Sequence, residues 1–275
     1  MRASTSTLLI APLVALMASP AQADYAPGAL VYIYGAYARA GDVLETDQVF
    51  SDTWSSGDAF ASMSKSASSW DYDYGMLRET EASISAHAQV GALHATATSK
   101  FIGKTSVGAE AFADLMFRDT LTITGTPGEW VTVAYTATLH GVHGCGGGDG
   151  GGAIAKYTFN FANQTHFPNG DHGTLNLTGC GEQTRDYEGF FYALPGDRVT
   201  VFSELNVFAK NGDSMDAGHT ARVFIDVKTP GAGFAADSGF AYSVSAVPEP
   251  TSGLMLGAGV LALMGRVYRR RSAGR

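Results

Sequence analysis

The sequence carries little charge, and most of that charge is negative. Charged residues make up 16% of its 275 residues, whereas an average soluble protein contains about 25%. Between Asp24 and Ala246 there are 12 Lys or Arg against 25 Asp or Glu, a formal charge of −13. This stretch has no basic patch that could neutralise phosphates, so the composition argues against nucleic acid as a partner.

Recognisable catalytic motifs are also missing. The chain has no Gly-x-Ser-x-Gly and no His-Glu-x-x-His, the spacings that mark a serine nucleophile and a zinc-binding helix. His140 and His143 lie close to Cys145, but residues three apart on a strand face opposite sides. We therefore expect polar loop histidines rather than metal ligands, and we predict that the protein is not an enzyme.

Cysteine occurs only twice, at Cys145 and Cys180, and each is flanked by glycine on both sides. In an exported chain an even number of cysteines favours a disulfide, and the alternative is two buried thiols. A metal site is disfavoured because two cysteines do not complete a tetrahedral ligand set. The predicted bridge would stabilise the fold by roughly 4 kcal/mol through loop closure.

No cofactor is expected, and calcium is the alternative that the acidic residues leave open. Candidate oxygen ligands are Asp71 with Asp73, Asp149 in a glycine-rich loop, and Asp213 with Asp216. None has the Asp-x-Asp-x-Asp-Gly spacing of a calcium loop. Ordinary turn aspartates explain the pattern better.

The chain lacks a long amphipathic helical pattern, and strand patterns fill its middle. From Glu81 to Val90, alanine, isoleucine and valine alternate with serine, histidine and glutamine, which is typical of a half-buried strand. Further short strands follow at intervals of about 8–12 residues with turn residues between them. We expect an all-β fold, a single antiparallel β-sandwich (jelly-roll-like), whose first stretch, 24–80, is less clearly patterned.

The N-terminus has the features of a secretory signal peptide. Arg2 precedes an apolar stretch, Leu8–Ala18, and Ala21 and Ala23 form a small-x-small cleavage site. The alternative is an N-terminal membrane anchor, but the apolar stretch is short for a span. The predicted organisation is a signal peptide at 1–23, a β-sandwich domain at 24–246 and a distinct tail at 247–275.

Four aromatic residues near the start of the domain could stack on sugars. Trp54 stands alone, whereas Trp70, Tyr72 and Tyr74 alternate and share one face of a strand. Such residues more often belong to a core than to a binding platform. Their exposure to solvent would distinguish a carbohydrate-binding module from a structural domain.

The tail joins an apolar segment to a basic end. Gly253–Gly265 contains no charge, and a helix of thirteen residues spans roughly 20 Å of a 30 Å membrane core. Flanking residues extend the predicted transmembrane helix to about 252–268. The arginines that should stop transfer and stay in the cytoplasm are Arg266, Arg269, Arg270 and Arg271. The alternative is a final core helix with a basic end.

The order of these features resembles the PEP-CTERM sorting signal of exported Gram-negative bacterial proteins. Pro248, Glu249 and Pro250 match the recognition triplet, and the apolar segment and arginine cluster follow it. The resemblance implies an exosortase as the processing partner, with the inner membrane holding the tail before processing. It also implies a final location at the cell surface or in the extracellular matrix, and an association with biofilm and exopolysaccharide.

Three stretches of the domain, AFADLMFRDTLTITG, FFYALPGDRVTVFSEL and HTARVFIDVKTPGAGFAADSGFAYS, are similar to a β-sandwich region of many proteins with this tail. No catalytic residues carry over from that similarity. We expect a non-enzymatic surface or matrix component. The alternatives are a module that binds exopolysaccharide and, less favoured, a secreted hydrolase.

Overall fold

The computed structural model describes residues 27–40, 43–55, 59–71, 76–102, 109–146, 151–163 and 166–242. Within these ranges the chain forms strands and no helix, and every strand pairing is antiparallel. The all-β, antiparallel prediction is therefore confirmed. The predicted signal segment with Ala21 and Ala23, and the predicted tail, lie outside the described residues.

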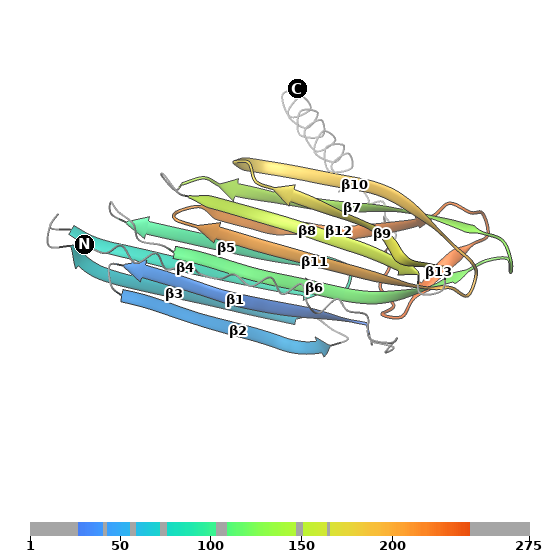
Figure 1. Ribbon diagram of the computed structural model, residues 1–275, viewed down its shortest axis with the longest axis horizontal. Coiled ribbons are helices and arrows are strands. Elements are labelled where there is room, and N and C mark those ends of the chain that lie inside the picture. The colour runs from blue at the N-terminus through green and yellow to red at the C-terminus, as the bar shows by residue number, and fades with distance from the viewer. Residues whose placement is uncertain are drawn as a thin grey trace, which may run out of the picture.

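The strands form two sheets that run along the long axis of the molecule (Figure 1). The larger sheet contains, in spatial order, β2 (Val43–Ser55), β1 (Gly28–Ala40), β6 (Ala109–Thr124), β11 (Arg198–Lys210), β8 (Gly152–Asn163) and β9 (Phe167–Leu177), with β13 (Gly233–Ala236) paired to the end of β6. The smaller sheet contains β10 (Gly181–Ala193), β7 (Val131–Gly144), β12 (Ser214–Val227), β5 (Ala92–Ile102), β4 (Met76–Gln89) and β3 (Ala59–Asp71).

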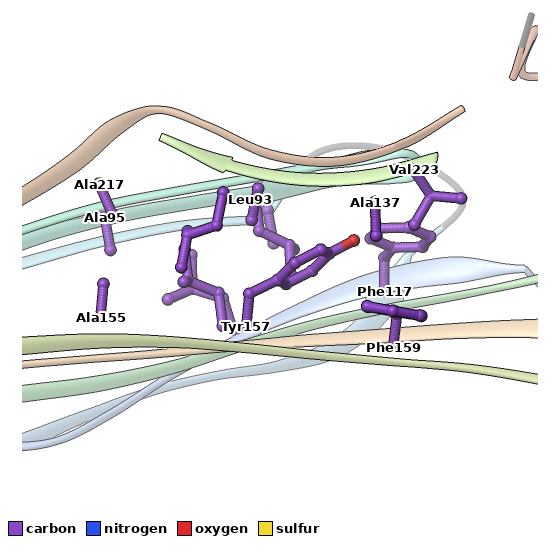
Figure 2. Packing of buried hydrophobic residues seen from close by; sticks show 14 of the residues in the cluster. Leu93, Ala95, Phe117, Ala137, Ala155, Tyr157, Phe159, Ala217 and Val223 are labelled. Carbon is purple, nitrogen blue, oxygen red and sulfur yellow. The ribbon is translucent and has the colours of Figure 1, made fainter. Parts of the chain in front are cut away.

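Alternation along each strand builds the core between the sheets. In β7, every odd-numbered residue from Val131 to Leu139 is buried and every even-numbered neighbour is partly exposed. Side chains of both sheets point toward one another, Leu93 and Ala137 from the smaller sheet and Phe117 and Tyr157 from the larger (Figure 2). This two-residue period lets each sheet bury one face and leave the other to solvent.

The size of the core side chains changes along the molecule. The half that contains the start of β6 and the end of β11 is lined by alanines, such as Ala111, Ala113 and Ala209. The other half holds large rings, including Phe117 and Phe161. Small residues allow the two sheets to approach closely, whereas large residues fill a wider space between them. The half of the core that holds the large rings is therefore wider, and its open end needs a cover.

Turn-forming residues do not always mark a strand end in this fold. Ala217-Gly218 lies inside β12, where the pairing register shifts between Asp216 and Ala221. Pro168–Gly170 belongs to β9. The unclear stretch 24–80 divides between the sheets, with β1 and β2 in the larger one and β3 in the smaller. Propensity at one site could not reveal these long-range pairings.

Candidate functional site

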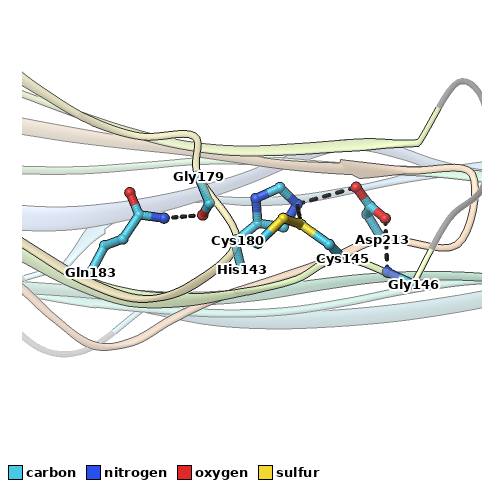
Figure 3. Close-up of a disulfide and its surroundings, with 7 residues drawn as sticks. All are labelled: His143, Cys145, Gly146, Gly179, Cys180, Gln183 and Asp213. Atoms are coloured by element: carbon cyan, nitrogen blue, oxygen red, sulfur yellow. Dashed lines mark hydrogen bonds and ion pairs between the residues drawn. A yellow bond between two sulfur atoms is a disulfide. The ribbon is translucent and has the colours of Figure 1, made fainter.

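The two cysteines form the predicted disulfide, with Cα atoms 5.6 Å apart. Cys145 directly follows β7, and Cys180 lies in the short connection between β9 and β10. This connection crosses from the larger sheet to the smaller. The disulfide therefore fixes the crossing at one end of the molecule, which we call the disulfide end (Figure 3).

A buried histidine and aspartate lie beside this disulfide. His143 Nε2 is 3.1 Å from Asp213 Oδ2 and 3.4 Å from Cys145 Sγ (Figure 3). Asp213 also accepts a hydrogen bond from the backbone N–H of Gly146 at 3.1 Å. The expectation of loop histidines was wrong for His143, which belongs to β7 and is buried because it points into the sandwich.

This group does not suit a metal ion. His143 Nε2 and the two cysteine sulfurs lie within 4.8 Å of one another, but the sulfurs are bonded to each other and cannot act as thiolate ligands. His140 faces the other side of β7 and pairs with Glu182 at 3.0 Å. The two histidines thus face opposite sides of the strand, as their spacing predicts.

The calcium candidates do not gather into one site among the described residues. Asp213 is buried and bonded to His143 rather than turned to solvent. Asp73 and Asp149 lie outside the described residues, as does the side chain of Asp71.

Strand β10 forms one edge of the smaller sheet and carries a row of aromatic residues. Its inward face adds Tyr187 and Phe191 to a ring cluster around Tyr135. Gly189 lies opposite Tyr135, and a Cβ at this position would come within 2.3 Å of the tyrosine oxygen. Glycine is therefore required for the ring to lie across the strand. Gly173 of β9 gives the same room to Phe159.

A pocket of about 170 Å³ opens beside this cluster, between β9 and β10. It is lined by Phe161, Asn163, Gly170, Asp171, Phe190, Phe191 and Tyr192. Tyr135 donates a hydrogen bond to Asp171 Oδ2 at 2.6 Å. Burial, and then the Asp171 carboxylate, raise the pKa of Tyr135 well above its usual range. Tyr135 therefore remains a donor, and Asp171 is the charged acceptor at the pocket.

The outward rings of β10 were missed by the sequence analysis. Phe190 and Tyr192 are exposed and form an edge-to-face pair with centroids 5.6 Å apart. Three consecutive aromatics on a strand must place at least one on each face, and this signal could have found them. The expected platform, Trp54, Trp70, Tyr72 and Tyr74, has its side chains outside the described part of the chain.

Two carboxyl groups meet on the outer face of the larger sheet. Burial, followed by the charge of Glu204 and a hydrogen bond with it, raises the pKa of Asp114 to about 8. Asn206 donates to Glu204 Oε1 at 3.1 Å. At neutral pH, Asp114 is therefore mostly protonated.

Residues Asp237–Tyr242 close the end of the sandwich that lies opposite the disulfide. We call these residues the terminal strap, and the end that they close the strap end. The Asp237 N–H donates to the carbonyl of Thr120 in β6 at 2.9 Å. The Ile225 N–H of β12 donates to the carbonyl of Tyr242 at 2.8 Å. The strap thus ties the larger sheet to the smaller at the half of the core that holds the large rings.

Asp119 is the buried anchor of the strap. One carboxylate oxygen accepts from the N–H groups of Thr120 at 2.8 Å and Ser238 at 3.1 Å, and the other accepts from the hydroxyls of Ser238 and Tyr242. Burial and the nearby Asp119 charge raise the pKa of Tyr242 well above its usual range. Tyr242 is completely buried, so the last described residue of the domain is firmly held.

A second buried aspartate organises the loops at the strap end. Hydrogen bonds from the Leu194 N–H, the Asn163 amide and His166 outweigh the effect of burial and hold the pKa of Asp197 below its usual range. His166 Nδ1 lies 3.0 Å from Asp197, and its ring meets the edge of Trp130 at 5.8 Å. The ionised Asp197 therefore helps to position an exposed tryptophan.

The sorting residues themselves, Pro248, Glu249 and Pro250, and the arginines Arg266, Arg269, Arg270 and Arg271, lie outside the described residues. Among the residues that are described, no helix has the length and apolar character needed to cross a membrane.

Comparison with known proteins identifies the tail. Residues 246–271 match the PEP-CTERM protein-sorting motif, so this chain carries the tail of an exosortase substrate, a signal for export and sorting to the surface. No curated protein matches the chain. A solved structure, the enzymatically active domain of bacteriophage CBA120 tailspike protein 4, aligns at 11% identity and a TM-score of 0.19. The alignment covers 60% of this chain and 19% of that one.

Proposed function

We propose that this protein is a non-enzymatic structural component of the cell surface or extracellular matrix, associated with biofilm and exopolysaccharide. The observation that carries the proposal is the sorting motif at 246–271, which implies that an exosortase processes the chain after export. A long antiparallel sandwich fixed by a disulfide suits such a role, because the exported protein must persist outside the cell.

The carboxyl groups of the described residues support a non-enzymatic role. Glycosidases keep their two carboxyl groups about 5 Å apart or more, so that a sugar or water fits between them. Asp114 and Glu204 instead hydrogen-bond to each other, and neither lines the pocket between β9 and β10. This pair leaves no room for a glycosidic bond.

The buried pair of His143 and Asp213 also has no nucleophile beside it among the described residues. His143 is buried against Asp213, and its Nδ1 has no hydrogen-bond partner in the described part of the chain. A histidine that activates a nucleophile acts as a general base and accepts the proton of that nucleophile. The nearby Cys145 sulfur is consumed in the disulfide and cannot serve as that nucleophile.

The test is the intact mass of the protein recovered from its own host, with the exosortase gene present and then deleted. We expect a C-terminus near Pro248–Pro250 only when the enzyme is present. A chain that keeps its arginines in both strains would refute exosortase processing. The structural role would be refuted by two results together: the processed protein is absent from the isolated matrix, and a strain that lacks the gene for this protein has an unchanged matrix mass.

The second candidate function is binding of exopolysaccharide, which the pocket between β9 and β10 favours. Aromatic rings present flat apolar faces to a ligand, and a few polar groups fix its orientation. Phe190 and Tyr192 supply the rings, and Asp171 and Asn163 supply an acceptor and an amide beside them.

Titration of the full chain with purified polysaccharides would test this candidate. We expect Tyr192→Ala and Phe190→Ala to weaken binding, whereas Phe60→Ala should not. Phe60 is a matched control because it is exposed but lies on β3, at the other edge of the same sheet. Equal binding by all three variants would exclude the pocket as the site.

A further inference from the structure

Exposed aromatic side chains gather at one end of the sandwich. Among the described residues, seven large hydrophobic side chains are exposed, and four of them belong to the terminal strap or to the strand ends beside it. We call these four the strap-end rim: Trp130, Phe190, Tyr192 and Phe240. The other three are Ile154, near the disulfide end, Tyr187, in the middle of β10, and Phe60, which the strand pairings place level with His140 of β7.

Different elements bring the rim together. Trp130 immediately precedes β7. Phe190 and Tyr192 belong to the last four residues of β10. Phe240 lies in the terminal strap and packs over the turn between β4 and β5. The antiparallel topology thus places four residues from three separate parts of the sequence at one end of the molecule.

The chain continues from this same end of the domain into the sorting motif. Tyr242 is buried and fixed by Asp119 and by the backbone of Ile225, and the motif begins at residue 246. From Tyr242 to Pro248 the chain advances six residues, which span at most about 20 Å when extended. The triplet therefore stays close to the strap end for as long as the strap stays folded.

The length of the domain makes this end distinct from the other. Strand β7 has 14 residues, and strands rise about 3.4 Å per residue, so the strap end and the disulfide end are separated by roughly 45 Å. A tail that is inserted in the membrane can therefore bring the strap end to the lipid surface. The disulfide end stays well away from it when the long axis stands on the membrane.

We propose that the strap-end rim lies against the lipid bilayer for as long as the sorting tail is attached. This inference rests on the proposed function in one respect, because it requires the tail to insert in the membrane. Tryptophan and tyrosine favour the interface between water and lipid, since they combine an apolar ring with a polar group. Trp130 and Tyr192 have this character and are 51% and 46% exposed.

The spacing of the rings favours a lipid surface over a single glycan. Tyr192 belongs to the edge strand β10, whereas Phe240 packs over the turn that begins β5, three strands farther across the same sheet. Three strand spacings of about 4.8 Å separate β10 from β5 by roughly 14 Å. The pocket between β9 and β10 includes Phe190 and Tyr192 but neither Trp130 nor Phe240, whereas a bilayer presents a surface wide enough to contact all four. Within the strap, Asp237 pairs with Arg198, and Asp226 of the neighbouring β12 pairs with Lys228.

The experiment uses the full chain reconstituted in vesicles of phosphatidylethanolamine and phosphatidylglycerol that contain lipids brominated along the acyl chain. The substitutions Trp54→Phe and Trp70→Phe leave Trp130 as the sole tryptophan. We expect the brominated lipids to reduce Trp130 fluorescence. The matched control adds Trp130→Phe and Ile154→Trp, which moves the tryptophan to an exposed position near the disulfide end and should prevent quenching.

Tail insertion is measured separately, by flotation of the vesicles and by protection of the tail from protease. A tail that does not insert refutes the membrane step of the proposed function, whereas an inserted tail with unquenched Trp130 overturns only the present inference. Quenching at Trp130 and Ile154→Trp alike also overturns it. A Trp130 shift caused by soluble polysaccharide, with no quenching by lipid, assigns the rim to sugar instead.

A second measurement avoids substituting the other two tryptophans. Photoactivatable lipids are crosslinked to the unmodified chain in the same vesicles, and the modified peptides are mapped by mass spectrometry. We expect labels on the peptides that contain Trp130 and Phe240, and none on the peptide that contains Ile154. Labels confined to the tail would overturn the inference.

Discussion

Replacing Asp119 by Asn should weaken the whole domain, because this substitution removes the charged acceptor of the terminal strap. In the native protein, Asp119 Oδ2 accepts from the hydroxyls of both Ser238 and Tyr242. Asn can keep the two backbone bonds at Oδ1, but its NH₂ group faces the two hydroxyls. Hydrogen bonds to a charged group contribute about 1.5–3 kcal/mol each, so we expect the free energy of unfolding to fall by roughly 3–5 kcal/mol.

A double-mutant cycle isolates the bond to the strap. Tyr242→Phe removes only the hydroxyl, and the cycle with Asp119→Asn should give a coupling energy of about 1–2 kcal/mol. Equilibrium unfolding of the full chain in urea measures each corner of the cycle. Hydrogen exchange of residues 237–242 in Asp119→Asn should rise before the strands unfold, because the strap loses its anchor first.

Asp226→Asn is the matched control, since Asp226 is exposed and forms an ion pair with the exposed Lys228. Surface changes of this kind alter stability by about 0.5 kcal/mol or less. If Asp119→Asn unfolds at the same urea concentration as this control, or if the cycle is additive, the anchor role of Asp119 is wrong.

Three further predictions concern other parts of the fold. Replacing Cys145 and Cys180 by Ser together should lower the free energy of unfolding by about 4 kcal/mol for a sequence separation of 35, and a reductant should then have no further effect in urea titrations. The pKa of Asp114 is raised to about 8 in the folded state, so protonated Asp114 contributes fully to stability below about pH 4, and this contribution is lost as the pH rises toward 8. Asp114→Asn should therefore flatten the dependence of the unfolding free energy on pH between about 4 and 8. An unchanged pH dependence would contradict the assignment. Four pKa units set an upper bound of about 5 kcal/mol on that effect. Gly189→Ala should cost roughly 1–3 kcal/mol through a clash with Tyr135, and Tyr135→Val should recover part of that loss in thermal unfolding.

The strand pattern could be predicted where one face of a strand is buried. The alternation from Glu81 to Val90 corresponds to the second half of β4, where one face is buried. The pattern was weakest over β1 to β3: β1 is apolar at almost every position, and serine, alanine and threonine are common in β2 and β3, so neither gives a clear contrast between two faces.

The candidate site was less predictable, because its contacts join residues far apart in the chain. Asp119 and Tyr242 are 123 residues apart, and Asp114 meets Glu204 only because β6 pairs with β11. A single carboxylate in a strand gives no sign of whether its partner is water, a hydroxyl or another acid. Its environment, and therefore its pKa, is decided when the strands pair.

The sequence by itself determined the all-β class, the cysteine pair and the sorting motif at 246–271. These features depend on local period, composition and the order of short segments, all of which a linear sequence contains. Only the tertiary structure decided that the strap closes the half of the core with the large rings, and that four exposed aromatics gather where the chain leaves for its sorting motif. Both depend on which strands become neighbours, because packing in three dimensions selects those neighbours and no local pattern specifies them.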